Sequence, residues 1–505
     1  MLNRFLALPF LVILIAIAAM AMIIPAAHAA SIKDFHVMRA FLQSSMIFLI
    51  LTSLVAIATI DNPVKNPARS HLIALLATFI ALPVMLAVPF YEAVGNTTFL
   101  NVYVEMVSSI TTTGATLFDT ARLPPSVHLW RALVAWMGGF FLWVTAIAIL
   151  APMNLGGFEV LSSSATGRGA VRSNDEIHST DSSVLLARYA GRLFPIYAGL
   201  TLVLWIVLIL AGDTSLVAFS HAMSTMSTSG ISPVGGLSGS NSGVAGEAMI
   251  FIFLVFALSR QTFAYDQPGN SLMRLLADPE FRFGAALVAG IPVLLFVRHF
   301  LGAIEVDAGD DFGGAVRALW GSAFTVMSFL TTAGFESSDW SETQQWSGLA
   351  TPGLILMGLV LVGGGVATTA GGVKLLRVYA LFKHGVREID KLVYPSSVAG
   401  AGAVARRLRR SGAQVAWIFF SLFALSLALV ATSFAYTGLS FDLATTLAVA
   451  ALSNTGPVIN AVLETPLLLG TLSTESKWIF TLAMVLGRLE TLAIIALFNP
   501  DFWRS

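Results

Sequence analysis

The stretch Ser109-Ile110-Thr111-Thr112-Thr113-Gly114-Ala115 decides the fold, because close variants of it recur along the chain. The three others are Ser224-Thr225-Met226-Ser227-Thr228-Ser229-Gly230-Ile231, Phe329-Leu330-Thr331-Thr332-Ala333-Gly334-Phe335 and Leu452-Ser453-Asn454-Thr455-Gly456-Pro457. Successive glycines lie 116, 104 and 122 residues apart, and every copy stands between hydrophobic stretches. One element repeated at such intervals indicates a pseudo-fourfold structure.

The composition is that of a membrane protein, since 56% of the 505 residues are hydrophobic and only 11% are charged. A soluble chain of this length carries more charge on its surface. Several apolar stretches are long enough to cross a bilayer as helices. They are 5–26, 41–60, 72–91, 130–151, 193–212, 248–265, 283–301, 352–381, 414–436 and 477–498.

Shorter apolar segments end at each threonine-glycine motif and are too short to span the membrane. They are 98–111, 215–227, 317–331 and 441–453. Such segments suit re-entrant pore helices that are buried in protein. We therefore predict an all-α membrane protein with four helix–pore-helix–filter–helix repeats around a pseudo-fourfold pore, preceded by two extra transmembrane helices. The predicted units are an N-terminal hairpin at 1–70 and pore repeats at 71–155, 156–270, 271–385 and 386–505, the third with a broken gating helix.

Four small polar loops around one axis can form a ring of backbone carbonyls that replaces the hydration shell of a monovalent cation. Glycine adopts the left-handed backbone that such a loop needs, and small residues let the loops approach each other. The alternative for any single motif is an ordinary turn. The predicted ion ligands are Thr112, Thr113, Gly114, Thr228, Ser229, Gly230, Thr332, Ala333, Gly334, Asn454, Thr455 and Gly456.

A second unusual segment lies within the apolar stretch 352–381 and is rich in glycine, which weakens a helix. We predict that it breaks the helix and forms a mobile gate below the filter; the alternative is close helix packing through small residues. Arg488 lies in the last apolar stretch, either as a barrier facing the cavity, as a partner of Glu490, or as a side chain that snorkels to the interface. Lys374 could belong to the gate or to the cytoplasmic interface. The predicted gating residues are Gly363, Gly364, Gly365, Thr368, Thr369, Gly371, Gly372, Lys374 and Arg488.

The sequence also argues against several functions. It has no cysteine and a net charge of zero, which excludes thiolate chemistry and gives no indication of nucleic-acid binding. A membrane-embedded hydrolase would need a nucleophile and a base, and His221 near the second motif has no evident paired acid. A secondary transporter of another solute would show inverted repeats, whereas these repeats look parallel. We expect no enzymatic activity and no organic cofactor.

The N-terminus and the loops bear on topology. Ala27-His28-Ala29 resembles the end of a cleavable signal, but the apolar run before it is longer than a usual signal core, so we expect a retained helix.

Basic residues concentrate in 383–410 and place that segment in the cytoplasm. Span counting then places the four motifs on the opposite side, near acids such as Glu336, which either attract cations or are simply solvated.

These features resemble the Trk/Ktr/HKT superfamily of potassium-uptake membrane subunits, and most closely its TrkH branch. The resemblance covers nearly the whole chain. It rests on Thr111–Thr116, Leu129-Trp130-Arg131, Trp136-Met137-Gly138-Gly139, Gly156-Gly157, Asp278-Pro279-Glu280, Gly363–Lys374, Leu486–Glu490 and Asn499–Arg504. The chain departs from the family at Ala367 and Ala370, where the family often has glycine in the loop, and this bears on how easily the gate opens.

The resemblance implies potassium as the transported ion and a bacterial inner-membrane, multi-pass location. It implies a homodimer in membrane lipid in which each protomer has its own pore. It also implies a cytosolic nucleotide-binding regulatory subunit of the TrkA type on the cytoplasmic face. Within the chain, it implies one filter glycine per repeat, a gating loop in the third repeat and a pore arginine at Arg488.

Overall fold

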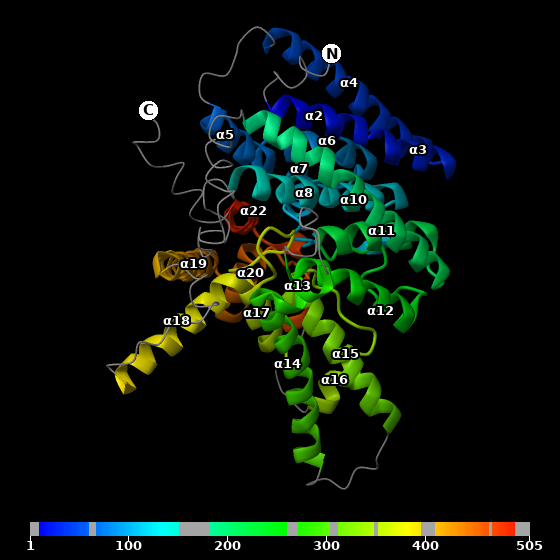
Figure 1. Cartoon of the computed structure of the whole chain (residues 1–505). Coiled ribbons are helices and arrows are strands. Elements are labelled where there is room, and N and C mark those ends of the chain that lie inside the picture. Colours follow the sequence, from blue (N-terminus) through cyan, green and yellow to red (C-terminus); the bar gives the residue numbers. More distant parts are fainter. Residues whose placement is uncertain are drawn as a thin grey trace.

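The computed structural model describes residues 10–59, 67–150, 182–259, 271–303, 312–347, 352–394, 410–463 and 467–489, and in these ranges every regular element is a helix (Figure 1). Within these ranges, seven helical stretches are long and apolar enough to cross a membrane. They are Phe10–Ser31, Phe35–Thr59, Ile73–Val94, Pro125–Ala148, Leu186–Leu210, Pro279–Arg298 and Gly412–Tyr436. The predicted all-α, multi-pass membrane fold is therefore confirmed.

The N-terminal hairpin lies along one side of the molecule (Figure 1). One arm consists of α2 (Phe10–Ala21) and α3 (Ile23–Ser31), and the other is α4 (Phe35–Thr59). The arms are joined by a 2.7 Å hydrogen bond from the Ser45 hydroxyl to the carbonyl of Ala19. Ile50 and Leu54 on α4 are more than 60% exposed and form an apolar face suited to lipid.

The first two repeats share the order long helix, short helix, polar segment, helix. The first contains α5 (Pro67–Ile80), α6 (Leu82–Val94), the pore helix α7 (Phe99–Ile110), α8 (Pro125–Thr145) and a π-helical end, η2 (Ala146–Leu150). The second contains α10 (Ser182–Leu210), the pore helix α11 (Ser215–Ser227), α12 (Gly243–Leu254) and the 3₁₀ turn η5 (Val255–Ala257). Pro83 at the start of α6 accounts for the break after α5, because proline cannot donate the backbone hydrogen bond that continuation needs.

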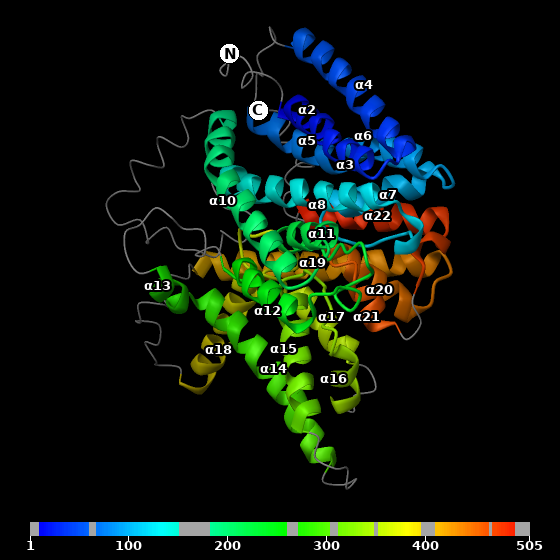
Figure 2. The ribbon, with the colours of Figure 1, turned by 90° about the vertical axis from the view of Figure 1, so that its right-hand side faces the viewer.

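The last two repeats follow the same order with insertions. The third contains α13 (Ser271–Ala277), α14 (Pro279–Ala303), the pore helix α15 (Phe312–Leu330), α16 (Trp340–Ser347), α17 (Gly353–Val362) and α18 (Leu375–Val393). The fourth contains α19 (Arg410–Tyr436), the pore helix α20 (Phe441–Leu452), α21 (Val458–Val462), the 3₁₀ turn η7 (Leu469–Thr471) and α22 (Thr474–Leu489). Helices α7, α8 and α22 run side by side across the molecule (Figure 2).

Three pore helices begin and end within one residue of the predicted segments, but the third does not. Helix α15 starts at Phe312 and has 19 residues, so the prediction of a start at 317 was wrong. Gly313 and Gly314 lie in the first turn of α15, where the buried side chains of Ala315 and Ala318 pack the helix against the protein. Burial of these alanines outweighs the low helix propensity of glycine.

Small residues let outer helices touch the ends of the pore helices. A Cβ added to Gly138 on α8 would lie 2.1 Å from the carbonyl oxygen of Ile110, the last residue of α7. A Cβ on Gly487 of α22 would lie 2.3 Å from the carbonyl oxygen of Leu452, the last residue of α20. Both positions therefore require glycine, and they show the same helix contact in the first and fourth repeats.

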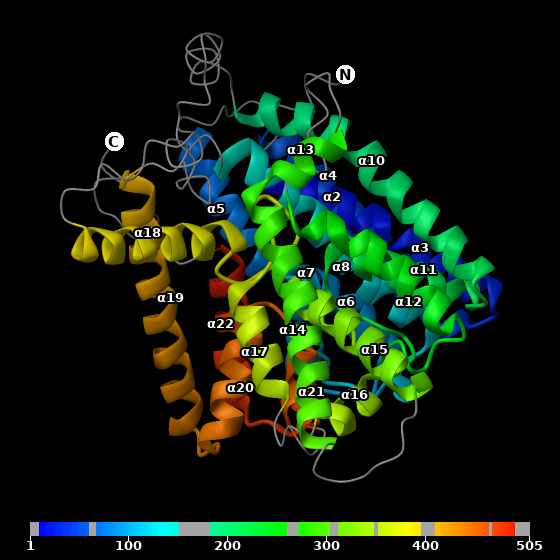
Figure 3. The ribbon, with the colours of Figure 1, turned by 60° about the horizontal axis from the view of Figure 1, so that its bottom comes forward.

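The third repeat departs from the others because its last helix is interrupted. Helix α17 ends at Val362, α18 begins at Leu375, and α18 leads away from the body of the molecule over α19 (Figures 1 and 3). The twelve intervening residues, Gly363–Lys374, are non-helical and mostly buried. The glycine-rich segment therefore breaks the helix in the interior of the protein, where its backbone groups need protein partners.

Candidate functional site

The four pore helices end in the same backbone motif. One residue just beyond the end of each pore helix has a left-handed φ, between +51° and +58°. These residues are Thr112, Thr228, Thr332 and Asn454. The amide of each bonds to the carbonyl three residues earlier, at 2.9–3.3 Å, and the next amide bonds to the carbonyl five residues before it, at 2.8–2.9 Å. This is the Schellman arrangement, which usually has glycine at the left-handed position.

A left-handed backbone costs a residue with a side chain roughly 1–2 kcal/mol. The sequence uses such a residue at this position in every repeat, and all four are at most 1% exposed. Strain that recurs at equivalent places is held by its surroundings and is typical of functional sites. The shared motif therefore indicates that the four segments have the same structural role.

The four segments touch each other in cyclic order. A Cβ added to the glycine of each segment would collide with the next segment: Gly114 with the Ser229 oxygen at 1.7 Å, Gly230 with the Ala333 oxygen at 2.3 Å, Gly334 with Pro457 Cγ at 2.9 Å, and Gly456 with the Ala115 nitrogen at 2.2 Å. The first repeat thus contacts the second, the second the third, the third the fourth, and the fourth the first. The contacts close a ring, and no side chain larger than hydrogen fits at the glycines.

The peptide group before each of the first three glycines lies at these contacts. The carbonyls of Ser229 and Ala333 face the glycine of the preceding repeat. The carbonyl of Thr113 accepts a 2.5 Å hydrogen bond from the amide of Gly456. The amide side chain of Asn454 donates to the Thr113 hydroxyl at 3.1 Å and to the Met484 carbonyl at 2.9 Å. Backbone oxygens from different repeats are therefore concentrated in a small volume.

Electrostatics at the ring favour a cation. Helices α7, α11, α15 and α20 all have their C-terminal ends at the ring. The C-terminal end of a helix carries a partial negative charge of about half an elementary charge. Four such ends and the adjacent carbonyl oxygens make this the kind of environment in which a desolvated monovalent cation is stabilised.

The segment Gly363–Lys374 forms a closed loop. Gly363 and Gly372 have φ values of +73° and +77°, which glycine adopts without steric cost. The amides of Val373 and Lys374 donate to the carbonyls of Leu361 and Val362, both at 2.9 Å, and close the neck of the loop. These two hydrogen bonds therefore hold the ends of the loop together where the helix is interrupted.

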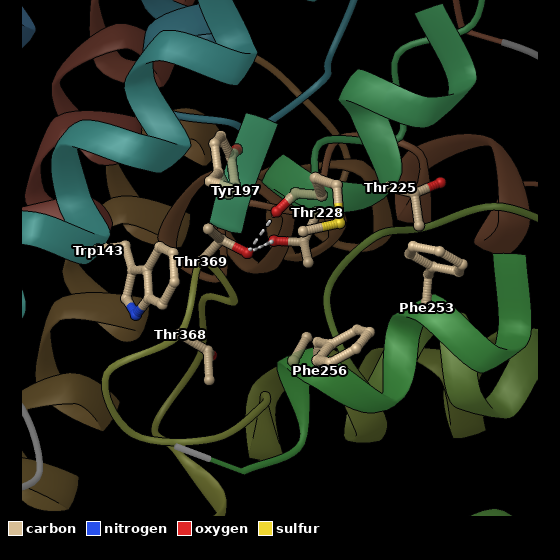
Figure 4. A pocket seen from close by; sticks show the side chains of 10 residues that line it. Trp143, Tyr197, Thr225, Thr228, Phe253, Phe256, Thr368 and Thr369 are labelled. Atoms are coloured by element: carbon tan, nitrogen blue, oxygen red, sulfur yellow. Dashed lines mark hydrogen bonds between the residues drawn. The ribbon is translucent and has the colours of Figure 1, made fainter. Parts of the chain in front are cut away.

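The tip of this loop lies against the ends of three pore helices. The Gly371 amide donates to the Thr332 hydroxyl at 2.7 Å, and a Cβ on Gly371 would lie 2.0 Å from the Ser453 oxygen. The Thr369 hydroxyl donates to the Met226 carbonyl at 3.2 Å and accepts a hydrogen bond from the Thr228 hydroxyl at 3.2 Å (Figure 4). The loop thus bonds directly to residues in or beside the left-handed motifs of the second, third and fourth repeats.

Charged side chains hold the loop from other sides. The Arg488 guanidinium donates to the carbonyl of Thr369 at 2.7 Å, and the Glu280 carboxylate accepts from the amide of Val366 at 2.7 Å. The Lys374 ammonium donates to the carbonyl of Ala370 and is 7% exposed, so its alternative placement at the cytoplasmic interface is wrong. Glu490, the other candidate partner of Arg488, lies outside the described residues.

A small pocket lies between the loop, the second repeat and Trp143 of α8 (Figure 4). Its lining combines aromatic rings with threonine hydroxyls, and Thr368 and Thr369 of the loop form one wall. The lining residues are Trp143, Tyr197, Thr225, Met226, Thr228, Phe253, Phe256, Ala257, Thr368 and Thr369. The loop therefore closes one side of this space, next to Thr228 of the second motif.

Comparison with known proteins agrees with this architecture. Residues 37–505 match the TrkH family model, which describes cation transport proteins. The chain belongs to the TrkH family. Trk system potassium uptake protein TrkH from Halomonas elongata is 30% identical to it over 79% of each chain. Its namesake in Escherichia coli K12 is 28% identical over 92% of each chain.

The fold is shared with a TrkH of known structure. The crystal structure of the potassium transporter TrkH from Vibrio parahaemolyticus covers the whole of both chains with a TM-score of 0.79 and 24% identity. The resemblance to the Trk/Ktr/HKT superfamily is therefore confirmed. Since TrkH proteins are cation transporters, this chain is a transporter and not an enzyme.

The TrkH chain also contains a residue cluster that the sequence did not reveal. His221 Nε2 lies 2.9 Å from the Ser232 hydroxyl, and His221 Nδ1 lies 3.9 Å from an oxygen of Asp213. The prediction that His221 lacks a paired acid was therefore wrong. Asp213 precedes the pore helix by two residues, and the chain turn at 211–214 folds it back onto His221, which the sequence alone does not show.

The cluster of Asp213, His221 and Ser232 supports the second threonine-glycine segment from behind. The carboxylate of Asp213 also accepts the amides of Asn241 and Ser242 at 2.8 and 3.0 Å. Burial alone would raise the pKa of Asp213, but His221 and these hydrogen bonds lower it below its usual value. Asp213 is thus held as a carboxylate.

Proposed function

We propose that this TrkH chain takes up potassium across the bacterial inner membrane through a selectivity filter formed by the four threonine-glycine segments. The ion ligands are the carbonyl and hydroxyl oxygens of Thr112–Gly114, Thr228–Gly230, Thr332–Gly334 and Asn454–Gly456. The names of its relatives describe them as potassium uptake proteins, which supports potassium as the ion.

One observation carries the proposal: the four filter glycines contact the next segment in cyclic order, from the first repeat round to the first again. A ring of this kind can replace the water around a monovalent cation with protein oxygens. A secondary transporter with inverted repeats would place two unlike halves around its substrate. The four alike motifs favour the filter.

The loop Gly363–Lys374 acts as the gate in this proposal. Its tip bonds to the second and third filters and packs on the fourth, where it would obstruct ion passage. Helix α18 starts at Leu375, directly after the loop, so a force on α18 would reach the loop through one continuous backbone. The guanidinium of Arg488 adds a positive charge beside the loop.

Helix α18 also supports the proposed partners, a second TrkH chain and a cytosolic nucleotide-binding subunit of the TrkA type. It leads away from the body of the molecule (Figure 3). Phe382, Ile389 and Leu392 on it are 58%, 61% and 82% exposed, and Lys383 and Arg387 make it basic. A partner bound here would be well placed to move the gate.

The direct test is ion flux into liposomes that contain the purified chain. We expect uptake of potassium and rubidium above that of protein-free liposomes, and much less uptake of sodium. Omitting every other small solute separates the candidates: uptake that persists supports a filter, and uptake that needs a particular second solute supports a coupled transporter. Equal sodium and potassium uptake would contradict a potassium filter.

A further inference from the structure

One position of the pore helices repeats behind the filters. It lies nine residues before each filter glycine and is occupied by Glu105, His221, Thr325 and Leu447. All four side chains are fully buried, at 0% exposure. Three of them are polar, which is costly in the interior of a membrane protein unless each side chain has a partner.

The polar side chains at this position reach the chain beyond the filter glycine of their own repeat. The carboxylate of Glu105 accepts the amide of Leu117 at 2.8 Å, and the hydroxyl of Thr325 accepts the amide of Ser337 at 3.2 Å. Both acceptors therefore bind the residue three positions after the glycine. His221 lies 2.9 Å from the hydroxyl of Ser232, two positions after the glycine.

Each of these contacts is backed by a second group. Arg131 lies 2.6 Å from Glu105, and Asp213 lies 3.9 Å from His221. In the third repeat, Glu247 accepts the Ser337 hydroxyl and the Ser338 amide, both at 2.7 Å. The outer end of three filters is therefore held by a two-layer polar support.

We propose that the pore-helix position nine residues before each filter glycine sets the geometry of the outer filter, and that Glu105, His221 and Thr325 are positioning residues for ion selectivity. The inference rests on the proposed filter function and goes beyond it, since these residues do not themselves coordinate the ion. Each peptide group is planar and moves as a unit, so anchoring the chain two or three residues after the glycine restrains the segment that carries the filter carbonyls.

The fourth repeat is the exception that the chemistry predicts. Leu447 cannot accept a hydrogen bond, and the segment after Gly456 starts with Pro457 and continues as α21. Proline has a fixed φ, and the amide three positions after the glycine, that of Ile459, donates to the carbonyl of Gly456 at 3.1 Å. This repeat therefore holds its outer end without a polar side chain at the pore-helix position.

The test uses Thr325, because removing either member of the buried Glu105–Arg131 pair would leave an isolated buried charge and could prevent folding. Thr325→Val keeps the shape and removes the acceptor for the Ser337 amide. Potassium-over-sodium discrimination is expected to fall about tenfold, while the protein remains folded. Thr325→Ser keeps the hydroxyl and should restore discrimination.

Thr446→Val is the matched control. Thr446 lies on the fourth pore helix, is 2% exposed and donates its hydroxyl hydrogen bond to the carbonyl of Asp442 in its own helix. Thr446→Val makes the same chemical change as Thr325→Val but removes no contact beyond the filter. Potassium-over-sodium discrimination should therefore stay at the wild-type value. An equal loss in both variants would show a general packing effect and overturn the proposal.

The ion preference of the wild-type protein distinguishes a failure of the proposed function from a failure of the positioning role. A wild-type protein that does not prefer potassium contradicts the proposed function. A selective wild type with an equally selective Thr325→Val variant contradicts only the positioning role. If Thr325→Val does not fold, Ser232→Ala tests the same role in the second repeat by removing the partner of His221. Wild-type discrimination in a folded Ser232→Ala protein would then overturn it.

Discussion

The guanidinium of Arg488 on α22 donates a 2.7 Å hydrogen bond to the backbone carbonyl of Thr369 in the tip of the glycine-rich loop. The two residues are 119 positions apart and belong to different repeats. The Thr369 hydroxyl also accepts a hydrogen bond from the hydroxyl of Thr228 in the second threonine-glycine segment. In the proposed function, Arg488 has two roles: its charge repels a cation, and its hydrogen bond holds the loop.

Replacing Arg488 separates these two effects. In Arg488→Gln both the charge and the strong hydrogen bond are lost, so potassium leak through the closed protein should rise about tenfold or more. Arg488→Lys keeps the charge but loses the planar guanidinium geometry. If charge is the main barrier, the lysine variant should leak much less than the glutamine variant.

The measurement is rubidium flux per folded protein, with folded protein quantified by size-exclusion chromatography. A folded Arg488→Gln protein with lower specific flux than wild type would reject the barrier role. If Arg488 instead serves as a structural partner of Glu490, Glu490→Gln should lower the yield of folded protein to the same extent as Arg488→Gln.

The close packing of the ring makes Gly114 a sharp test of the filter. A Cβ at Gly114 would lie 1.7 Å from the Ser229 oxygen, so Gly114→Ala should abolish potassium uptake or admit sodium. Gly95 is the matched control, since it has a similar φ of +65° but nothing within 4 Å of an added Cβ. Gly95→Ala costs only about 1–2 kcal/mol of backbone strain and should keep selective uptake.

Both alanine variants are to be compared in the same liposome assay with potassium and sodium in parallel. Selective, wild-type uptake by Gly114→Ala would mean that the first segment does not belong to the filter. A similar loss in both variants would mean that backbone strain, rather than the contact with the second repeat, is responsible.

Removing the tip of the loop should open the gate. Deletion of 364–369 takes away the hydrogen bonds to Met226, Thr228 and Arg488 but leaves the neck residues Val373 and Lys374 in place. Basal potassium flux should then rise without any regulatory subunit, because the obstruction below the filter is gone. Flux at or below the wild-type level in a folded deletion protein would count against gating.

The alanine at position 367 bears on how tightly the loop closes. Ala367 has a φ of +54°, a conformation that glycine adopts freely and alanine resists by roughly 1 kcal/mol or more. Ala367→Gly should relieve this strain in the closed loop and lower basal flux about fivefold. Ala370→Gly adds a glycine where φ is not positive, so it should not lower flux. A decrease in both variants would point to flexibility instead of strain relief.

The sequence was informative where the physics is local. Threonine-glycine motifs after apolar segments located the ends of α7, α11 and α20 to within a residue, and the glycines of 363–372 located the break between α17 and α18. These features follow from hydrophobic length and backbone preference, which are properties of neighbouring residues.

Contacts between distant residues were beyond the sequence. The pairing of Asp213 with His221 depends on a chain turn, and the left-handed backbone of Ala367 is imposed by the loop around it. The burial of Lys374 depends on carbonyls that only the folded loop presents. In each case the deciding partner is set by tertiary packing, which overrides local preference.

Pro457 provides the last test, because its ring connects two filters as well as ending its own. A Cβ at Gly230 would lie 2.8 Å from Pro457 Cγ, and one at Gly334 would lie 2.9 Å from the same atom, so the ring packs between the second and third segments. Pro457→Ala removes this ring and frees φ. Potassium flux should persist. Potassium-over-sodium discrimination should fall about 3–10-fold, because the loss of the ring removes roughly 1 kcal/mol of packing. Competition between potassium and sodium in the liposome assay measures the change. The proline control is Pro352→Ala at the N-cap of α17, which is not among the atoms nearest to Gly230 or Gly334. Unaltered discrimination in a folded Pro457→Ala protein would show that the proline only ends the turn.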